Sequence, residues 1–214
     1  MKHTNENLFI FDMDGTLIDS RTDIAAAVNE VRGHYGLENL SVETVCSYVG
    51  NGPDLLIDRA LKGISFDPAE ALTHFLDVYA RGANDKTRPY DGVVKGLEGL
   101  MKQGHTLAVS TNKPHDCCLS ILKHLGMTRF FSEVLGEGAG YRIKPDPETL
   151  LRIMAVTGHG PEKTYMVGDH HTDIESADRA GVKSVFLTGG IGCLDGRKPD
   201  FVFDTFADFT SYFI

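Results

Sequence analysis

The sequence predicts an α/β fold, with a doubly wound parallel sheet and a small helical bundle inserted after the first strand. Two observations lead to this fold class. Beyond residue 88, short apolar runs alternate with helical patterns, and repeated βα units imply a parallel sheet in three layers. Residues 20–85 show helical periodicity instead, with no strand between the helices. The 214 residues, 42% of them hydrophobic, are enough for one sizeable core with an inserted subdomain.

Residues 8–11 predict the central strand. Their unbroken apolar run, Leu-Phe-Ile-Phe, is typical of a strand buried on both faces of a parallel sheet. Asp12 and Asp14 follow at i and i+2, so both side chains point to one side of the sheet edge, and Gly15 permits a sharp turn. Because open α/β sheets bind ligands beyond the carboxyl ends of their strands, we expect the site here. The alternative is a solvated Asp-Gly turn without chemistry.

Four helices are expected in the inserted segment. Apolar residues at positions 24, 28, 31 and 35 form one stripe of a helix that ends near Gly36. Ser41 can cap a short second helix, Asn51-Gly52-Pro53 can begin a third, and Asp67-Pro68 can begin a fourth.

The second half of the chain predicts alternating helices and strands. Asp91 can cap a helix that ends near Gly104, and Pro114 can open one that closes at Gly126. Further helices are expected to begin at Asp146-Pro147 and to cover 174–180. The strand candidates are 106–109, 130–135, 165–167, 182–187 and an edge strand at 201–203.

Polar residues follow the first predicted strand, and they occur again in three later segments of the chain. Ser110-Thr111-Asn112 follow the strand at 106–109, Lys144-Pro145-Asp146-Pro147 open a helix after a Gly-rich loop, and residues 168–173, Gly-Asp-His-His-Thr-Asp, follow the strand at 165–167. Parallel strands end on the same side, so we expect these groups to meet Asp12. Each also has a plainer interpretation: a strand-end hydroxyl, a solvated lysine, or acids that cap a helix.

The gathered residues indicate phosphoryl chemistry on a divalent cation. Four clustered carboxylates raise one another's pKa unless cations compensate, and oxygen ligands without a His/Cys cluster favour Mg²⁺. Thr111 and Lys144 can hold a phosphoryl group while Asp12 attacks phosphorus and Asp14 protonates the leaving alcohol. His170 and His171 are adjacent rather than at i and i+4, which favours supporting or solvent-facing roles over ligation. The four carboxylates are those of Asp12, Asp14, Asp169 and Asp173.

Four segments resemble, in order, the motifs of the haloacid dehalogenase superfamily: D-M-D-G-T, S-T-N, K-P-D-P and G-D-H-H-T-D. Most members of that superfamily are magnesium-dependent aspartyl phosphatases. The resemblance implies a Rossmann-like core with Asp12 as nucleophile and Asp14 as general acid/base. It further implies phosphate-binding roles for Thr111, Asn112 and Lys144, metal ligation by Asp12, Asp14 (through its carbonyl) and Asp169, and supporting roles for Asp173 and for His170, where many relatives carry Ser.

The position of the helical insert is similar to that in the helical-cap subclass of this superfamily. This implies a core of residues 1–17 and 87–214 and a cap of residues 18–86. Three stretches, at 19–28, 48–61 and 87–93, resemble the phosphoglycolate phosphatases within that subclass. The loop Gly50-Asn51-Gly52 could receive the carboxylate of 2-phosphoglycolate at a helix N-terminus, with Arg59 as a weaker candidate. The alternative is an ordinary turn in which Asn51 caps the helix.

The expected function is therefore Mg²⁺-dependent hydrolysis of a small anionic phosphomonoester, with 2-phosphoglycolate favoured. A sugar-phosphate phosphatase or mutase of the same fold is the nearest alternative. A dehalogenase would need neither metal nor Asp14, and a phosphonate-cleaving enzyme would need a cap lysine such as Lys62. A non-catalytic phosphate-binding module is the alternative from another class, but it has no use for Asp14 as a proton donor.

Composition limits partners and location. The net charge of −9 argues against nucleic acid and anionic membranes as partners. No signal peptide or membrane span fits the N-terminal residues, and the four cysteines lack zinc spacing, so we expect free thiols in a cytoplasmic protein. The sequence leaves open whether the chain is a monomer or a homodimer.

Overall fold

The computed structural model describes residues 6–82 and 85–214, and it contains the predicted parallel sheet. Six strands lie in the order β5-β4-β1-β6-β7-β8, and every adjacent pair is parallel. The chain moves outward from β1 first to one edge and then to the other, which is the doubly wound topology. The strands are β1 (Leu8–Phe11), β4 (Thr106–Pro114), β5 (Glu133–Glu137), β6 (Thr164–Gly168), β7 (Lys183–Leu187) and β8 (Phe201–Phe203).

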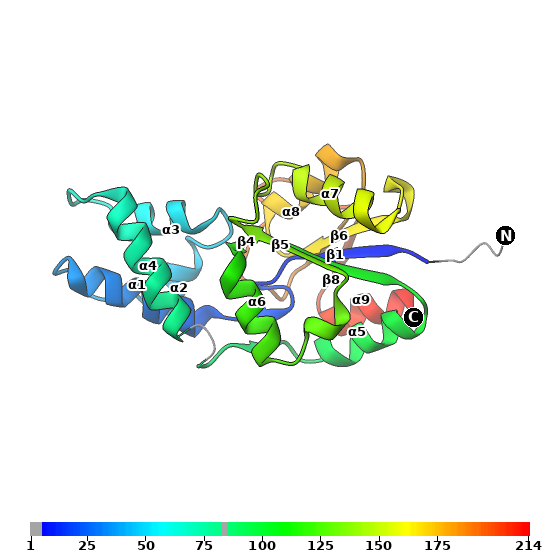
Figure 1. Ribbon diagram of the computed structural model, residues 1–214, viewed down its shortest axis with the longest axis horizontal. Helices are drawn as coiled ribbons and strands as arrows, with labels where there is room; N and C mark the ends of the chain where they lie inside the picture. The colour runs from blue at the N-terminus through cyan, green and yellow to red at the C-terminus, as the bar shows by residue number, and fades with distance from the viewer. Residues whose placement is uncertain (1–5, 83–84) are drawn as a thin grey trace.

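Strand β1 is buried on both faces, as its apolar run predicts. Phe9 and Phe11 point into one core, and Leu8 and Ile10 point into the other. Helices α5, α6 and α9 cover the first face, and α7 and α8 cover the second (Figure 1). Their bounds are α5 (Val93–Lys102), α6 (His115–His124), α7 (Glu148–Thr157), α8 (His171–Ala180) and α9 (Phe206–Phe213), with 3₁₀ turns at Thr128–Phe130 and Pro161–Lys163.

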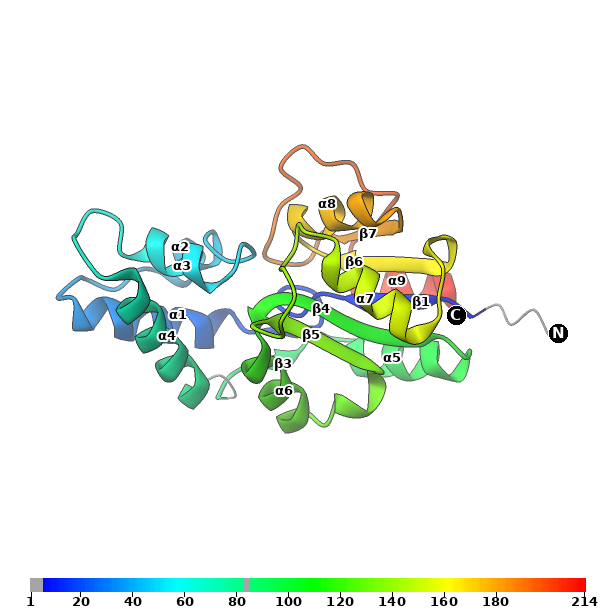
Figure 2. The ribbon, with the colours of Figure 1, turned by 45° about the horizontal axis from the view of Figure 1, so that its top comes forward.

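The inserted segment folds into four helices beyond the carboxyl ends of the strands (Figure 2). They are α1 (Arg21–His34), α2 (Val42–Cys46), α3 (Pro53–Ala60) and α4 (Pro68–Gly82). Ser41 caps α2 as predicted, since its side chain accepts a hydrogen bond from the Thr44 N–H. We call these four helices the cap. Residues 83–84 of the predicted cap and 1–5 of the predicted core lie outside the described residues.

A two-stranded antiparallel ribbon, which the sequence did not predict, joins the cap to the core. It pairs β2 (Ile18–Asp19) with β3 (Arg88–Pro89), so the chain enters and leaves the cap at one place. The buried carboxylate of Asp23 accepts hydrogen bonds from the backbone N–H groups of Lys86 and Thr87 and from the Thr87 hydroxyl. These bonds fasten the first turn of α1 to the returning segment.

Several predicted boundaries are wrong. Strand β4 continues to Pro114 instead of ending at 109, because β5 pairs with it again at Pro114 after a shift in register. Gly92, not Asp91, is the N-cap of α5; its φ of 83° suits glycine. The strand expected at 130–135 is preceded by a 3₁₀ turn and begins only at Glu133. The sequence patterns did not predict helix α9, whose phenylalanines pack on Phe9 and Phe11. Among the described residues, no helix is long and apolar enough to cross a membrane.

Candidate active site

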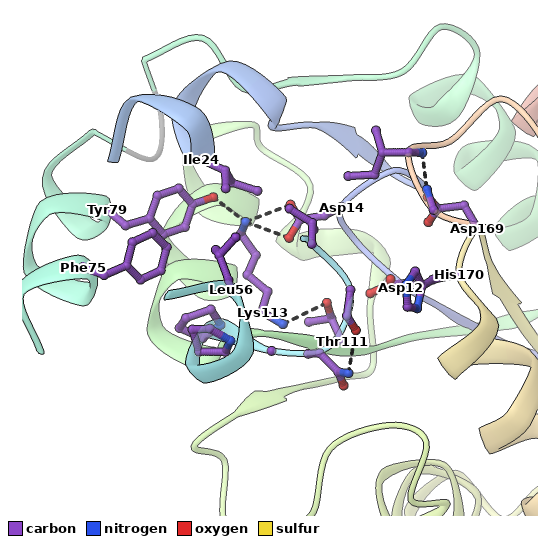
Figure 3. Close-up of a pocket in the computed structure, with 18 residues that line it drawn as sticks. Asp12, Asp14, Ile24, Leu56, Phe75, Tyr79, Thr111, Lys113, Asp169 and His170 are labelled. Carbon is purple, nitrogen blue, oxygen red and sulfur yellow. Dashed lines mark hydrogen bonds and ion pairs between the residues drawn. The ribbon is translucent and has the colours of Figure 1, made fainter. Parts of the chain in front are cut away.

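The predicted polar residues of four separate segments meet at the carboxyl edge of the sheet, and those of three segments line a pocket between core and cap (Figure 3). Asp12 follows β1, Thr111 lies in β4, and Asp169 follows β6. Lys144 comes from the loop before α7, and its ammonium forms an ion pair with Asp12 in the same cluster. All four side chains are buried. The turn that the plainer interpretation would leave in solvent is therefore enclosed.

Lys144 links two of the aspartates. Its Nζ lies 3.1 Å from Asp12 Oδ1 and 2.6 Å from Asp173 Oδ1, and it donates to the Ser110 carbonyl at 2.7 Å. Although burial opposes the charged ammonium, Asp12 and Asp173 raise the pKa of Lys144, so it stays protonated. Burial raises the pKa of Asp12, Lys144 lowers it, and the nearby Asp173 raises it again.

Asp169 is held by the backbone and a hydroxyl instead of by a cationic side chain. Its Oδ1 accepts a hydrogen bond from Thr16 Oγ1 at 2.9 Å, and its Oδ2 accepts from the N–H groups of Ile191 and Gly192, both at 2.8 Å. Burial, and then the charges of Asp12 and Asp173, raise the pKa of Asp169 to about 7. Among the described residues, the Asp169 carboxylate therefore receives hydrogen bonds from neutral donors only.

Three buried carboxylates, those of Asp12, Asp169 and Asp173, offer oxygen atoms within 4.8 Å of one another. Such a donor set, all oxygen and buried, suits a hard divalent cation. Asp173 takes part although its predicted role was a supporting one, and it also accepts a hydrogen bond from the His170 N–H at 3.0 Å as part of the α8 capping box. The carboxylate of Asp14 does not belong to this acidic group.

Asp14 instead pairs with Lys113, a residue for which the sequence patterns predicted no role. Lys113 Nζ donates to both carboxylate oxygens of Asp14, at 2.8 and 3.0 Å, and Ser20 Oγ donates to Oδ1. Lys113 also contacts the hydroxyl of Tyr79 in α4 (Figure 3). Strand alternation places residues 111 and 113 on the same side, so a lysine two residues beyond Thr111 was the available signal.

Thr111 and Asn112, which are neighbours in β4, have different partners. Thr111 lines the pocket, its hydroxyl helps to lower the pKa of Asp12, and its Oγ1 accepts a hydrogen bond from the Lys113 N–H at 3.3 Å. Asn112 Nδ2 donates to the backbone carbonyls of Gly50 at 2.9 Å and Lys144 at 2.8 Å. Both amide hydrogens are thus engaged, and the buried Oδ1 has no partner. Asn112 therefore connects the core to the cap loop at Gly50.

The cap loop 50–52 closes one side of the pocket. Gly50 and Gly52 line it, whereas Asn51 and Arg59 are not among the lining residues. The Arg59 guanidinium donates to the Tyr48 carbonyl at 3.0 Å and to Asn51 Oδ1 at 3.1 Å, so it braces the loop from behind. The idea that Asn51 caps α3 is wrong: the N-cap is Gly52, whose φ of 93° suits glycine.

His170 packs under this loop. A Cβ added to Gly50 would lie 2.6 Å from the His170 ring, so only glycine fits there without displacement. The His170 side chain accepts from the Thr172 N–H as the N-cap of α8. Burial, together with the neighbouring His171, lowers the pKa of His170 to about 4. The imidazole is therefore neutral at physiological pH and offers an apolar face to the loop.

Several known proteins are similar to this chain over most of its length. A phosphoglycolate phosphatase from Pseudomonas putida is 37% identical over 211 residues, which cover 94% of this chain and 77% of the relative. One from Mannheimia succiniciproducens is 36% identical, covering 92% of this chain and 94% of the relative. The crystal structure of a predicted phosphoglycolate phosphatase from Haemophilus somnus superposes with a TM-score of 0.91 at 33% identity, covering 99% and 100% of the two chains.

A model of a protein family also matches this chain. The model of the haloacid dehalogenase-like hydrolases covers residues 9–187, which include all four motifs and the cap helices. This confirms the resemblance seen in the motifs. The chain belongs to the haloacid dehalogenase-like hydrolase family.

Proposed function

We propose that this protein is a phosphatase that hydrolyses 2-phosphoglycolate to glycolate and phosphate through a phosphorylated Asp12. The observation that carries the proposal is the meeting of Thr111 and Lys144 with a cluster of three buried carboxylates, one of them Asp12, under a helical cap. The relatives that match over most of the chain are phosphoglycolate phosphatases, which favours this substrate.

In the first step, an oxygen of the Asp12 carboxylate attacks phosphorus and the bond to the leaving alcohol oxygen breaks. Asp14 enters this step protonated, gives that oxygen its proton so that the alcohol leaves neutral, and becomes the carboxylate that pairs with Lys113. In the second step, Asp14 takes a proton from water as the water oxygen attacks phosphorus. The acyl-phosphate bond breaks, Asp12 returns as a carboxylate, and inorganic phosphate leaves. Lys144 and Thr111 hold the phosphoryl oxygens throughout.

A divalent cation fits the acidic group. Asp12 and Asp169 would ligate it by their carboxylates and Asp14 by its backbone carbonyl, while Asp173 holds Lys144 beside Asp12. Burial and the charges of Asp12 and Asp173 raise the pKa of Asp169, and a divalent cation held there would oppose that rise. When bound, Mg²⁺ neutralises the charge that gathers between the carboxylates and the phosphoryl group.

The cap, for which we propose the boundaries 18–86, gives the pocket a largely apolar wall. Ile24, Leu56, Phe75 and the ring of Tyr79 face the aspartates, and the loop at Gly50 narrows the pocket (Figure 3). A closed apolar cover excludes bulk water and leaves room for a small leaving group. Lys62, the candidate for Schiff-base chemistry, is exposed and does not line the pocket, so the phosphonate-cleaving alternative lacks support.

The test is a phosphate-release screen with 2-phosphoglycolate, hexose phosphates and pyrophosphate, with Mg²⁺ or with EDTA. We expect 2-phosphoglycolate to have the highest kcat/KM, and Asp12→Asn or EDTA to abolish release. Conversion of a hexose 1-phosphate to its 6-phosphate would instead identify a mutase. Phosphate release that survives both Asp12→Asn and EDTA would refute the proposed chemistry.

A further inference from the structure

Lys113 is a buried cation that the proposed chemistry does not yet use. It lies near the end of β4, with its side chain 1% exposed, and it lines the pocket beside Asp14. A lysine ammonium has three N–H donors. Two are directed at the two oxygens of Asp14, and the third at the hydroxyl of Tyr79. These contacts use the full donor capacity of the group.

The pairing with Asp14 is the reason why the lysine can be buried. Taking an ammonium out of water costs several kcal/mol unless an opposite charge and hydrogen bonds compensate. Among the described residues, Asp14 is the carboxylate that forms an ion pair with Lys113. The side chain of Asp14 is in turn held on two sides, by Lys113 and by the hydroxyl of Ser20. Its carboxylate is therefore confined to one place at the rim of the acidic group.

Tyr79 brings the cap into this arrangement. It is fully buried in α4, and its ring stacks on Phe75 with centroids 5.5 Å apart and an interplanar angle of 6°. Lys113 Nζ also lies 4.6 Å from the centre of the Tyr79 ring, within range of a cation–π contact. The lysine is thus held between a residue of the core and a residue of the cap (Figure 3).

We propose that Lys113 is a positioning residue that holds the Asp14 carboxylate facing the leaving group, and that its contact with Tyr79 makes this position depend on cap closure. The inference rests on the proposed function, because it assigns the placement of the group that protonates the leaving oxygen. With the cap open, Lys113 loses the Tyr79 hydroxyl and its aromatic face, so its ammonium, and with it the paired Asp14 carboxylate, is held by fewer contacts. Proton donation then occurs only over a substrate that the cap has enclosed.

A positioning role has a kinetic signature that depends on the leaving group. An alkoxide needs a proton as it departs, and a positioned general acid contributes about 10²–10⁴-fold to such a step. A p-nitrophenolate leaves without one. Lys113→Met should therefore lower kcat for 2-phosphoglycolate by about 10²–10³-fold and kcat for p-nitrophenyl phosphate by less than about tenfold. Tyr79→Phe keeps the stacked ring and removes the hydroxyl; it should show the same preference for the aryl ester, with a smaller loss for 2-phosphoglycolate.

The controls separate positioning from general damage. Lys123→Met, on the exposed side of α6, should change neither rate. Beryllofluoride binding, measured by calorimetry, should persist in Lys113→Met, since the phosphoryl site at Asp12 and Lys144 is intact. In an Asp14→Asn background, Lys113→Met should lower kcat little further, because the group that it positions is already gone.

Each outcome decides the inference. Equal losses with both esters, with beryllofluoride binding preserved, would overturn it, as would a full additional loss in the Asp14→Asn background. Should Lys113→Met fail to fold, Tyr79→Phe decides: equal loss or no loss with the two esters would overturn the role of the cap contact. A wild-type protein that hydrolyses neither ester refutes the proposed function itself, and the positioning role falls with it.

Discussion

Replacing Lys144 by methionine removes the cation that joins Asp12 and Asp173, and it should destabilise the metal-free protein strongly. The ammonium is 1% exposed, and its two carboxylate partners lie at 3.1 and 2.6 Å. Methionine fills similar volume but leaves both carboxylates buried without their shared counter-charge. Breaking a buried ion pair from one side costs about 3–5 kcal/mol in the free energy of unfolding. For a chain of this size, we expect the melting temperature to fall by about 10 °C.

The loss should also depend on pH in a defined direction. In the wild type, burial already raises the pKa of Asp12, and Lys144 opposes the rise. Without Lys144, the folded-state pKa of Asp12 rises further above its unfolded value of 3.8. Such a group contributes stability at low pH and loses it as pH rises through the folded-state pKa. The difference between wild type and Lys144→Met should therefore be smaller at pH 5 than at pH 8.

Urea denaturation of the EDTA-treated proteins at pH 5 and pH 8 measures both effects. Lys102→Met, at the exposed end of α5, is the matched control and should change the free energy of unfolding by less than about 0.5 kcal/mol. A loss below about 1 kcal/mol for Lys144→Met, or a larger loss at pH 5 than at pH 8, would refute this account of the buried charges.

Three further predictions concern the metal, His170 and the cap loop. Because the pKa of Asp169 is raised to about 7, Mg²⁺ should raise the melting temperature more at pH 8 than at pH 6, and Asp169→Asn should remove the effect. The pKa of His170 is about 4 when folded and 6.5 when unfolded, so stability should fall by about 2 kcal/mol as pH drops from 8 to 5; His170→Asn, which can still cap α8, should not show this component in urea denaturation. Gly50→Ala forces a Cβ against His170 and should lower kcat/KM at least about tenfold, whereas Gly138→Ala, also at positive φ but in open space, should leave it unchanged in the phosphate-release assay.

The sequence was sufficient to place the core residues because regular geometry determines where they go. An apolar four-residue strand at the centre of a parallel sheet fixes the direction of Asp12, and the common carboxyl edge brings Thr111 and Asp169 to it. The helical periodicity of the insert similarly predicted each of its four helices. These inferences depend on periods of 2 and 3.6 residues and on strand polarity, all of which are local.

The contacts between cap and core could not be predicted in this way. Lys113 meets Tyr79 from an element 34 residues earlier, and that meeting depends on how the cap docks, which no local period encodes. The same holds for Asn112, whose amide binds the Gly50 carbonyl, and for Arg59, whose guanidinium is engaged behind the loop. The residue types at 112 and 59 suggested anion binding. Their partners in the fold are backbone and side-chain oxygens of the protein itself.

The charges around the pocket support the proposed divalent cation. Lys113 compensates Asp14, and Lys144 is shared between Asp12 and Asp173. Asp169 receives neutral donors only among the described residues, and burial, followed by the charges of Asp12 and Asp173, raises its pKa to about 7. Four carboxylates and two ammonium groups leave two negative charges uncompensated, and a phosphate ester brings further negative charge. A divalent cation would restore the balance, and the two lysines cannot, because each is already paired with carboxylates of the site.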